Sequence, residues 1–395
     1  MSRRVCALVG AGRLAGGFVA PLLDDAGWET ILICRNTAVL EAVNRSGGIQ
    51  LRILGQPPRE YWIGGIRAIG LDDRRLPEIV AGADLLATAV GPFALATVGR
   101  ALAPALAFRF EVVGAPINVL TFENHRRAPE LLATGLVETR PSLAGEIGRR
   151  LGIGGVVAWR LAAHREITSE AVRFDADGVS ECYAEAASLL PGVPPLDGAV
   201  PGIELVRSFD VRMVEKLWLF NAGHAAAAYL GWHAGCTGLH EAMANARIRE
   251  VVCSVLIEAQ QGLQVYVRAH PAAEPFPPRP IDAVLARYGD PALSDPVVRV
   301  GREPRRKLAP GDRLIGPATA CLDAGVPPVA LASAAAAALA YAEPSDPQAM
   351  DLQRELAFLE PEEVLSMVSG LDARDELARL IGHCYRARRV GEAAR

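Results

Sequence analysis

Short apolar runs alternate with helical patterns over the first third of the chain. The run Val5–Val9 carries no charged residue, and a strand of this kind is buried on both faces. The segments between the runs repeat apolar residues at helical spacing instead. This alternation predicts an α/β fold with a doubly wound parallel sheet. The predicted strands are Val5–Val9, Thr30–Cys34, Asp84–Val90 and Asn118–Phe122, and the predicted helices are Gly16–Ala26, Ala38–Asn44 and Ala94–Ala105.

The pattern changes after Leu189. The stretch Leu189–Gly202 reads LLPGVPPLDGAVPG, and its four prolines and three glycines exclude the interior of a helix. Beyond it helical patterns prevail, and Ile203–Tyr229 and Leu239–Tyr266 are long candidate helices. We therefore predict an α/β domain over residues 1–190 and a mainly α-helical domain over residues 191–395.

Composition narrows the class of protein. The 395 residues suffice for two domains, and a net charge of −4 gives no reason to expect nucleic acid or an anionic membrane as partner. The seven cysteines form no CxxC pair, which argues against a disulfide framework and against a zinc site. The alanine-rich stretch Ala330–Ala342 is shorter than the roughly 20 residues of a membrane span. We expect a cytoplasmic protein without a metal.

A glycine-rich turn follows the first predicted strand. Gly10 and Gly12 precede Ala15 in a GxGxxA pattern that opens the first helix. The first glycine permits a tight turn, the second lets the backbone approach a pyrophosphate, and a small third residue lets helix and strand pack closely. In this context the pattern favours a Rossmann-like dinucleotide-binding domain, with a purely structural turn as the alternative.

The end of the second strand bears on the choice of cofactor. An acidic residue there would bind the ribose 2′-hydroxyl of NAD, but this chain has Cys34 followed by Arg35. A guanidinium without a neighbouring carboxylate suits a 2′-phosphate, so we predict NADP in preference to NAD. The alternative is that Arg35 is solvated and that selectivity is lax.

Three polar residues lie within the long predicted helix Ile203–Tyr229. At about 100° per residue, Asn221 and His224 share a face, and Lys216 is about 80° from His224. Each residue has an ordinary structural explanation when taken singly. Their spacing alone therefore leaves catalysis and a solvated or packed role both open.

The segment Lys216-Leu-Trp-Leu-Phe-Asn221-Ala-Gly-His224 resembles the signature of the polyol-specific long-chain dehydrogenases, in particular their mannitol-1-phosphate 5-dehydrogenase branch. The resemblance extends over nearly the whole chain. It includes Thr88-Ala-Val90-Gly91-Pro92, Glu123-Asn124 and the basic segment from Val300 to Arg313.

This resemblance implies a metal-independent transfer of hydride between a sugar-alcohol phosphate and a ketose phosphate. Lys216 would be the general acid and base, Asn124 and Asn221 would donate hydrogen bonds to the reacting oxygen, and His224 would orient it. A monomer is also implied. We expect cofactor contacts at Gly10, Gly12, Ala15, Arg35, Thr88, Val90 and Gly91. The match to the sugar-phosphate branch implies substrate-phosphate contacts at Arg302, Arg306, Lys307 and Arg313, with a solvated charge run as the alternative.

The chain departs from the family pattern at three places. Cys34 stands where the family has an acid. The glycine loop of the family continues Asn-Ile-Gly-Arg-Gly-Phe, whereas Arg13–Phe18 reads RLAGGF, so an arginine beside the pyrophosphate is lost. The Asp-Arg pair that the family carries near the substrate has Trp159-Arg160 as its nearest counterpart. These departures spare Lys216, Asn221 and His224.

Three hypotheses for function follow. The first is interconversion of mannitol 1-phosphate and fructose 6-phosphate, or a closely similar reaction. The second is a reductase of the same class that acts on a different polyol or keto compound in a specialised biosynthetic pathway. The third is a dinucleotide-binding sensor without turnover, against which the intact trio of Lys216, Asn221 and His224 argues.

Overall fold

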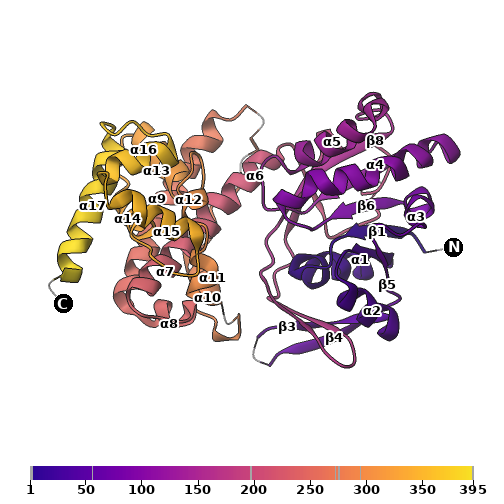
Figure 1. The fold of residues 1–395 in the computed structure, drawn as a ribbon, viewed down its shortest axis with the longest axis horizontal. Helices are drawn as coiled ribbons and strands as arrows, with labels where there is room; N and C mark the ends of the chain where they lie inside the picture. Colours follow the sequence, from indigo (N-terminus) through magenta and orange to yellow (C-terminus); the bar gives the residue numbers. More distant parts are fainter. Residues whose placement is uncertain are drawn as a thin grey trace. The chain divides into compact units, whose positions relative to one another are not determined.

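The computed structural model describes residues 3–55, 57–195, 198–271, 273–274, 276–293 and 295–393. The chain forms two compact units, Met1–Met213 and Val214–Arg395, which we call unit 1 and unit 2. Figure 1 colours them from indigo to magenta and from rose to yellow. Each unit is described by itself.

Unit 1 is built on an eight-stranded sheet with the order β12-β11-β8-β7-β6-β1-β2-β5. The six strands from β8 to β5 are mutually parallel, which confirms the predicted doubly wound fold. β11 joins this sheet antiparallel to β8. The strands are β1 Val5–Val9, β2 Glu29–Cys34, β5 Arg67–Gly70, β6 Leu85–Thr88, β7 Ile117–Thr121, β8 Leu151–Ala158, β11 Cys182–Glu185 and β12 Glu204–Val206.

Helices cover both faces of the parallel part of the sheet. Alternate side chains of β1 enter opposite cores, with Cys6 and Leu8 in one cluster and Ala7 and Val9 in the other. This is why the strand reads as an uninterrupted apolar run. The helical elements of unit 1 are η1 Ala15–Val19, α1 Ala20–Asp25, α2 Thr37–Ser46, α3 Leu76–Gly82, η2 Pro92–Ala94, α4 Leu95–Val112, α5 Ala128–Thr139, η3 Pro141–Gly145 and η4 Ala186–Ser188.

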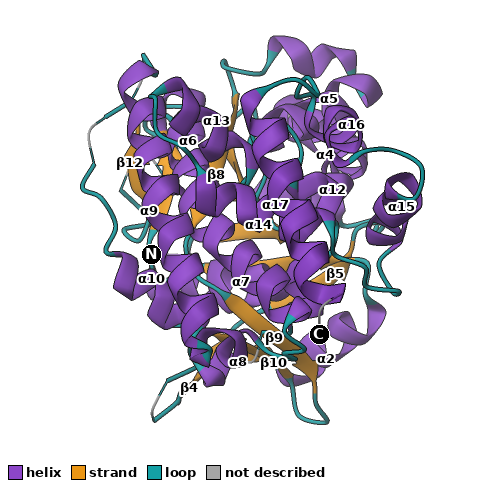
Figure 2. Cartoon of the chain, turned by 90° about the vertical axis from the view of Figure 1, so that its left-hand side faces the viewer, coloured by secondary structure: helices purple, strands orange, loops and turns teal. Residues whose placement is uncertain are grey.

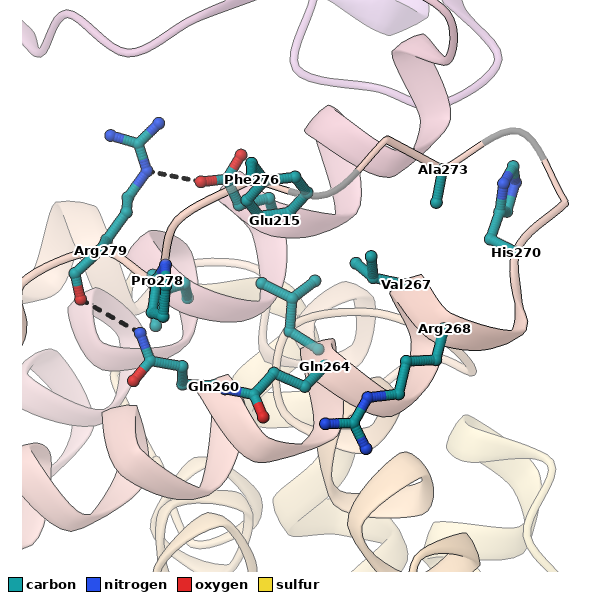
Figure 3. A pocket seen from close by; sticks show the side chains of 12 residues that line it. Glu215, Gln260, Gln264, Val267, Arg268, His270, Ala273, Phe276, Pro278 and Arg279 are labelled. Carbon is teal, nitrogen blue, oxygen red and sulfur yellow. Dashed lines mark hydrogen bonds and ion pairs between the residues drawn. The ribbon is translucent and has the colours of Figure 1, made fainter.

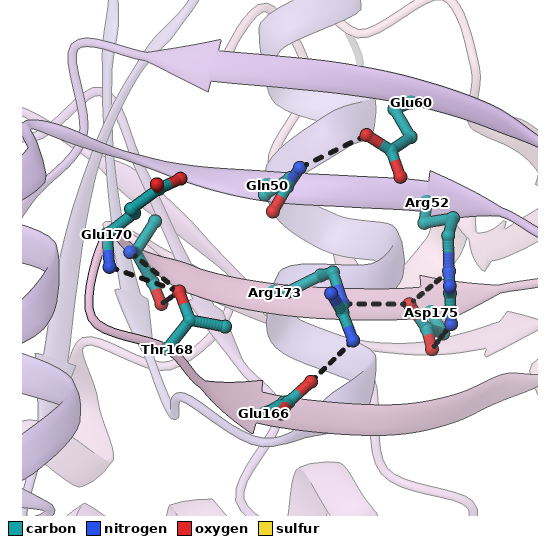
Figure 4. A network of polar contacts seen from close by, with 9 residues as sticks. Gln50, Arg52, Glu60, Glu166, Thr168, Glu170, Arg173 and Asp175 are labelled. Atoms are coloured by element: carbon teal, nitrogen blue, oxygen red, sulfur yellow. Dashed lines mark hydrogen bonds and ion pairs between the residues drawn. The ribbon is translucent and has the colours of Figure 1, made fainter.

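A second sheet of unit 1 was not foreseen from the sequence. Its order is β4-β3-β10-β9, with bounds Arg59–Gly64, Gly48–Ile53, Val172–Ala176 and Ala162–Ile167. Phe174 and its alternate neighbours are buried, whereas Arg173 and Asp175 point to the other face. There Asp175 pairs with Arg52 at 2.5 Å and Arg173 pairs with Glu166 (Figure 4).

The proline-rich stretch after Leu189 belongs to unit 1. The buried amide of Asn118 in β7 holds it, because Nδ2 donates to the carbonyls of Leu190, Val193 and Pro194. The chain then returns as β12 to pair with β11. The compact units therefore divide after Met213, later than the boundary at residues 190 and 191 that the composition suggests. Residues 196 and 197 of this stretch lie outside the described residues.

Every regular element described in unit 2 is a helix (Figure 2). The predicted helix Ile203–Tyr229 is wrong at its start, since Glu204–Val206 forms β12 and the helix begins at Phe209. The predicted helix Leu239–Tyr266 is interrupted at Asn245, whose side chain caps the following helix. The elements are α6 Phe209–Glu215, η5 Lys216–Phe220, α7 Asn221–His233, α8 Leu239–Ala244, α9 Ala246–Ala269, α10 Ile281–Tyr288, η6 Pro291–Leu293, α11 Val297–Gly301, α12 Pro304–Lys307, α13 Ile315–Asp323, α14 Val329–Leu339, α15 Pro347–Leu356, α16 Pro361–Ser369 and α17 Glu376–Ala393.

The helices α4 and α5 of unit 1 cross in direct backbone contact, which gives a test of the packing. A Cβ atom on Gly135 would lie 2.0 Å from the carbonyl oxygen of Ala96, so Gly135→Ala must push the two helices apart. We expect the free energy of unfolding to fall by about 1–3 kcal/mol, as overpacked cores do.

Gly82→Ala is the matched control, because a Cβ atom at Gly82 meets nothing within 4 Å at the end of α3. Urea denaturation followed by circular dichroism compares the two variants. Equal midpoints for both would contradict the close α4–α5 contact.

Candidate active site

The glycine loop connects β1 to η1. Gly10 has a φ of 125°, and a Cβ atom there would lie 2.5 Å from the carbonyl oxygen of Ala89, so only glycine fits this turn. A Cβ atom on Gly12 would still be 3.7 Å from that oxygen. Because Gly12 has no Cβ atom, its backbone stays open toward the adjoining pocket, as the close approach of a pyrophosphate requires. Ala15 is fully buried in the first turn of η1, where a small residue permits close packing.

A pocket of about 190 Å³ lies beside this loop. Gly10 and Gly12 line it together with Cys34, Arg35 and Asn36 at the end of β2. It also contains Arg165 from β9, whose Nη1 donates to the carbonyl oxygen of Ala11 at 2.8 Å. The described lining residues thus include two arginines and no carboxylate. Sequence reasoning missed Arg165, because only the second sheet brings residue 165 to the glycine loop.

The remaining predicted cofactor contacts lie at the end of β6. Val90 lines the pocket, and Gly91 has a φ of 88° just before η2. Thr88 is fully buried and does not line it; its hydroxyl donates to the Glu123 carboxylate at 2.8 Å. Glu123 also accepts from the backbone N–H of Val90 at 2.9 Å, so it ties the ends of β6 and β7 together. Burial raises the pKa of Glu123, and these hydrogen bonds oppose the rise. Asn124, the next residue, is exposed.

In unit 2 a π turn changes the geometry of the predicted trio. The backbone N–H of Asn221 donates to the carbonyl of Lys216, five residues earlier, and η5 is the π turn that this bond closes. In a regular α-helix five residues would separate the two side chains by about 140°. The i→i+5 bond instead places Asn221 one turn above Lys216, where an α-helix would have its i+4 residue.

The additional residue in the π turn also brings His224 closer to the face of the helix that carries Lys216. Eight residues after Lys216, it would lie about 80° away in an α-helix, but with one residue absorbed by the π turn it lies about 20° away. The trio thus has the effective spacing i, i+4, i+7 and shares one face of the helix. On a regular helix, as the sequence analysis assumed, Lys216 would lie about 80° from His224.

The amide of Asn221 is poised to donate. Asn221 is 7% exposed, and its Nδ2 has no hydrogen-bond partner among the described residues. A buried donor without a partner costs about 1–3 kcal/mol, so each such atom calls for an explanation. An oxygen atom of a bound substrate would satisfy this group.

The imidazole of His224 is enclosed by neighbouring side chains. Its Nε2 is 3.0 Å from Oδ2 of Asp295, and the ring of Tyr288 stacks on the imidazole at 5.4 Å. The Tyr288 hydroxyl donates to the carbonyl of Phe220 at 2.6 Å, at the last residue of the π turn. A Cβ atom on Gly223 would lie 2.9 Å from that hydroxyl oxygen, so the glycine between Asn221 and His224 makes room for Tyr288.

A second pocket, of about 390 Å³, is lined in part by Glu215 at the end of α6 and Leu219 in η5 (Figure 3). Glu215, Leu263, Val267 and Phe276 line it, and Glu215 pairs with Arg279 at 2.6 Å. Lys216, Asn221 and His224 are not among its lining residues. Its lining combines apolar side chains with polar ones such as Gln260 and Gln264, and the carboxylate of Glu215 is ion-paired.

The four predicted phosphate contacts lie in α12 or near it in the sequence. Arg306 pairs with Glu303 at 2.8 Å, Arg313 pairs with Asp312 at 2.6 Å, and the buried amine of Lys307 donates to the carbonyl of Arg302. Burial, with the charges of Arg313 and Arg306, lowers the pKa of Lys307 to about 6. The cluster therefore combines internal carboxylate partners with a cationic environment around one amine.

Fold and site together define an oxidoreductase that uses a nicotinamide dinucleotide. Two domain families match this chain in the expected order, the mannitol dehydrogenase Rossmann domain over residues 6–146 and the mannitol dehydrogenase C-terminal domain over residues 207–387. The chain belongs to the mannitol dehydrogenase family, whose members are polyol dehydrogenases acting on CH–OH groups.

Solved structures show the same fold over nearly the whole length. Pseudomonas fluorescens mannitol 2-dehydrogenase, in a ternary complex with NAD and D-mannitol, is 14% identical with a TM-score of 0.74 and covers 98% of this chain and 92% of its own. A substrate-free D-sorbitol dehydrogenase is also 14% identical, with a TM-score of 0.74 over 98% of this chain and 93% of its own. A ketopantoate reductase from Ralstonia eutropha JMP134 is 18% identical, with a TM-score of 0.50 over 85% and 97%.

The buried amine of Lys307 predicts a pH dependence of stability. Its pKa falls from a usual value of 10.5 to about 6 on folding, so between these values the unfolded chain binds more protons than the folded one. The free energy of unfolding therefore gains a contribution that rises with pH over this window. Lys307→Met removes it, and the stability of the wild type relative to the variant should increase from pH 6 to pH 9.

Urea titrations at several pH values measure this difference. Groups whose pKa does not depend on Lys307 contribute equally to both proteins, so they cancel in the comparison. Parallel curves for the two proteins would show that Lys307 has an ordinary pKa.

Proposed function

We propose that this protein interconverts a polyol and the corresponding ketose with Lys216 as general acid and base. The observation that carries the proposal is the π turn, which brings an amine, an unpartnered amide and an imidazole to one face of a single helix. A nicotinamide ring bound through unit 1 would supply the site that accepts or gives the hydride. The residues of unit 2 would supply proton transfer and orientation.

Lys216 is chemically distinct among the basic residues. Only two of the 41 basic residues of this chain are lysines, at positions 216 and 307. An arginine keeps its proton at any physiological pH, whereas an amine can release one when its surroundings lower its pKa. A chain that uses arginine for nearly every cation thus keeps a lysine where the reaction needs a group that can lose its proton.

The proton path follows from these groups. In the oxidative direction the neutral amine of Lys216 takes the proton of the reacting hydroxyl while hydride leaves the same carbon. Asn221 donates to the oxygen as negative charge develops on it, an interaction worth about 10²–10³ in rate at comparable sites. In the reductive direction the ammonium of Lys216 returns the proton. Asn124 belongs to unit 1, and its role as a second donor stays a prediction.

For the cofactor we propose NADP in preference to NAD. Arg35 and Arg165 supply two guanidinium groups to the pocket that begins at the glycine loop, and its described lining residues include no carboxylate that would bind a 2′-hydroxyl. Two charge-assisted contacts to a 2′-phosphate discriminate between the cofactors better than a single exposed arginine.

For the substrate we propose a phosphorylated polyol, because the guanidinium groups of Arg306 and Arg313 carry positive charge near the buried amine of Lys307, whose pKa they lower. An anion bound there would relieve the repulsion among these cations. The internal partners of Arg306 and Arg313 favour the second candidate, an unphosphorylated polyol. Reduction of a panel of ketoses and their phosphates, followed through the absorbance of the reduced nicotinamide, distinguishes the two. Turnover of unphosphorylated ketoses alone would exclude the phosphate site.

Lys216→Met should lower kcat by about 10²–10⁴, the usual contribution of general acid–base catalysis. The variant keeps the length of the side chain without a proton-carrying group. Binding of the dinucleotide should be unchanged, because the glycine loop lies in unit 1, and this serves as the control for folding. Near-normal turnover of Lys216→Met would remove the assigned acid and base.

Arg165→Ala and Arg35→Ala should each weaken NADPH binding about tenfold or more, with a smaller effect on NADH, because a charged hydrogen bond contributes about 1.5–3 kcal/mol. Titration of the fluorescence of the reduced cofactor measures both dissociation constants without turnover. Arg45→Ala, an exposed arginine outside the pocket, is the matched control. An unchanged ratio of the two constants in both variants would contradict the NADP preference.

A further inference from the structure

Asp295 is the residue that most directly constrains His224. It lies just before α11, and its own carbonyl accepts the backbone N–H of Leu239 at 2.9 Å, which fixes the segment against the start of α8. Its side chain is 6% exposed and uses both carboxylate oxygens. Oδ2 contacts His224 Nε2, and Oδ1 accepts from Nε of Arg299 at 2.6 Å.

The ionisation of this pair follows from its surroundings. Burial alone would raise the pKa of Asp295, but the hydrogen bonds and charges of His224 and Arg299 outweigh it and hold the pKa below its usual value. Burial lowers the pKa of His224, with Arg299 and Arg313 acting in the same direction and Asp295 opposing them. A carboxylate therefore faces a neutral imidazole near neutral pH.

A neutral imidazole has a single N–H group, and the carboxylate determines which nitrogen carries it. Asp295 can only accept, so the proton is on Nε2 and Nδ1 keeps its lone pair. The stacked ring of Tyr288 and the neighbouring ring of Phe220 fix the plane of the imidazole. Both the orientation and the tautomer of His224 are thus set by residues outside the Lys–Asn–His signature.

We propose that Asp295 is a positioning residue that holds His224 as the Nε2–H tautomer, so that Nδ1 accepts a hydrogen bond from a hydroxyl group of the substrate. This role rests on the proposed polyol dehydrogenase function. It gives the trio a division of labour: Asn221 donates to the reacting oxygen, Lys216 moves its proton, and His224 accepts from a hydroxyl and cannot donate to the developing charge. Such an acceptor favours a polyol, which has adjacent hydroxyls, over a substrate with a single hydroxyl.

The test is a direct measurement of the tautomer. Long-range ¹H–¹⁵N correlation spectra of protein labelled at histidine distinguish protonated from unprotonated ring nitrogens, and His224→Gln assigns the signal. We expect a protonated Nε2 and an unprotonated Nδ1 in the wild type. In Asp295→Asn the amide can also turn its NH₂ toward the ring, so the single tautomer should give way to a mixture. A protonated Nδ1 in the wild type, or an unchanged tautomer in Asp295→Asn, would overturn the inference.

Kinetics supply the second readout. Asp295→Asn should lower kcat/KM by about 10–100-fold, the range seen when the orienting partner of a metal-bound histidine is removed. Asp175→Asn is the matched control, because Asp175 is 5% exposed and pairs with Arg52 in the second sheet of unit 1. It should lose stability in the same way and leave the His224 signal and kcat/KM unchanged. An equal loss of kcat/KM in both variants would show that Asp295 acts through stability alone.

The two proposals fail in different ways. A wild type that turns over no polyol or ketose would overturn the proposed function, whereas the spectra would still decide whether Asp295 sets the tautomer. A wild type that is active but has Nδ1 protonated would overturn only the role of Asp295.

Discussion

One backbone hydrogen bond, from the N–H of Asn221 to the carbonyl of Lys216, determines the geometry of the candidate site in unit 2. Without it the amine and the amide would point about 140° apart. A π turn interrupts the regular ladder of helical bonds, and two features stabilise it here. Tyr288 donates to the carbonyl of Phe220 at its end, and the apolar residues Leu217–Phe220 are buried. The signature spacing, five positions from Lys216 to Asn221 and three from Asn221 to His224, is thus the spacing that a π turn requires to form one face.

The parallel sheet of unit 1 could be predicted because its physical cause is local. A strand buried on both faces must be apolar throughout, and Val5–Val9 shows this directly. The second sheet escaped prediction because β9 and β4 are mostly exposed, so their residues do not form apolar runs. The trio was found through its signature, whereas Arg165 and Asp295 were missed because neither is near its partner in the sequence. The absence of a carboxylate at position 34 indicated that a second cation could bind the cofactor, but it did not indicate which residue would supply that cation.

The two π turns among the described residues, η1 and η5, share a functional context. η1 follows the glycine loop, and its closing bond runs from the N–H of Ala20 to the carbonyl of Ala15. η5 carries the beginning of the trio. Such turns persist mainly where function compensates for the weaker hydrogen bonding. We propose that unit 1 binds the dinucleotide and that unit 2 transfers the proton. The location of η1 in unit 1 and of η5 in unit 2 agrees with this assignment.

One departure from the family pattern at the glycine loop has a structural cause. The family has an arginine where this chain has Gly16. A Cβ atom on Gly16 would lie 2.3 Å from the ring of Phe174, so the packing of the second sheet excludes any side chain there. That same sheet carries Arg165, which reaches the carbonyl of Ala11 within the loop. The family's arginine on the helix is thus replaced by Arg165 on β9. The second sheet excludes a side chain at position 16 and at the same time places a cation beside the backbone of the loop.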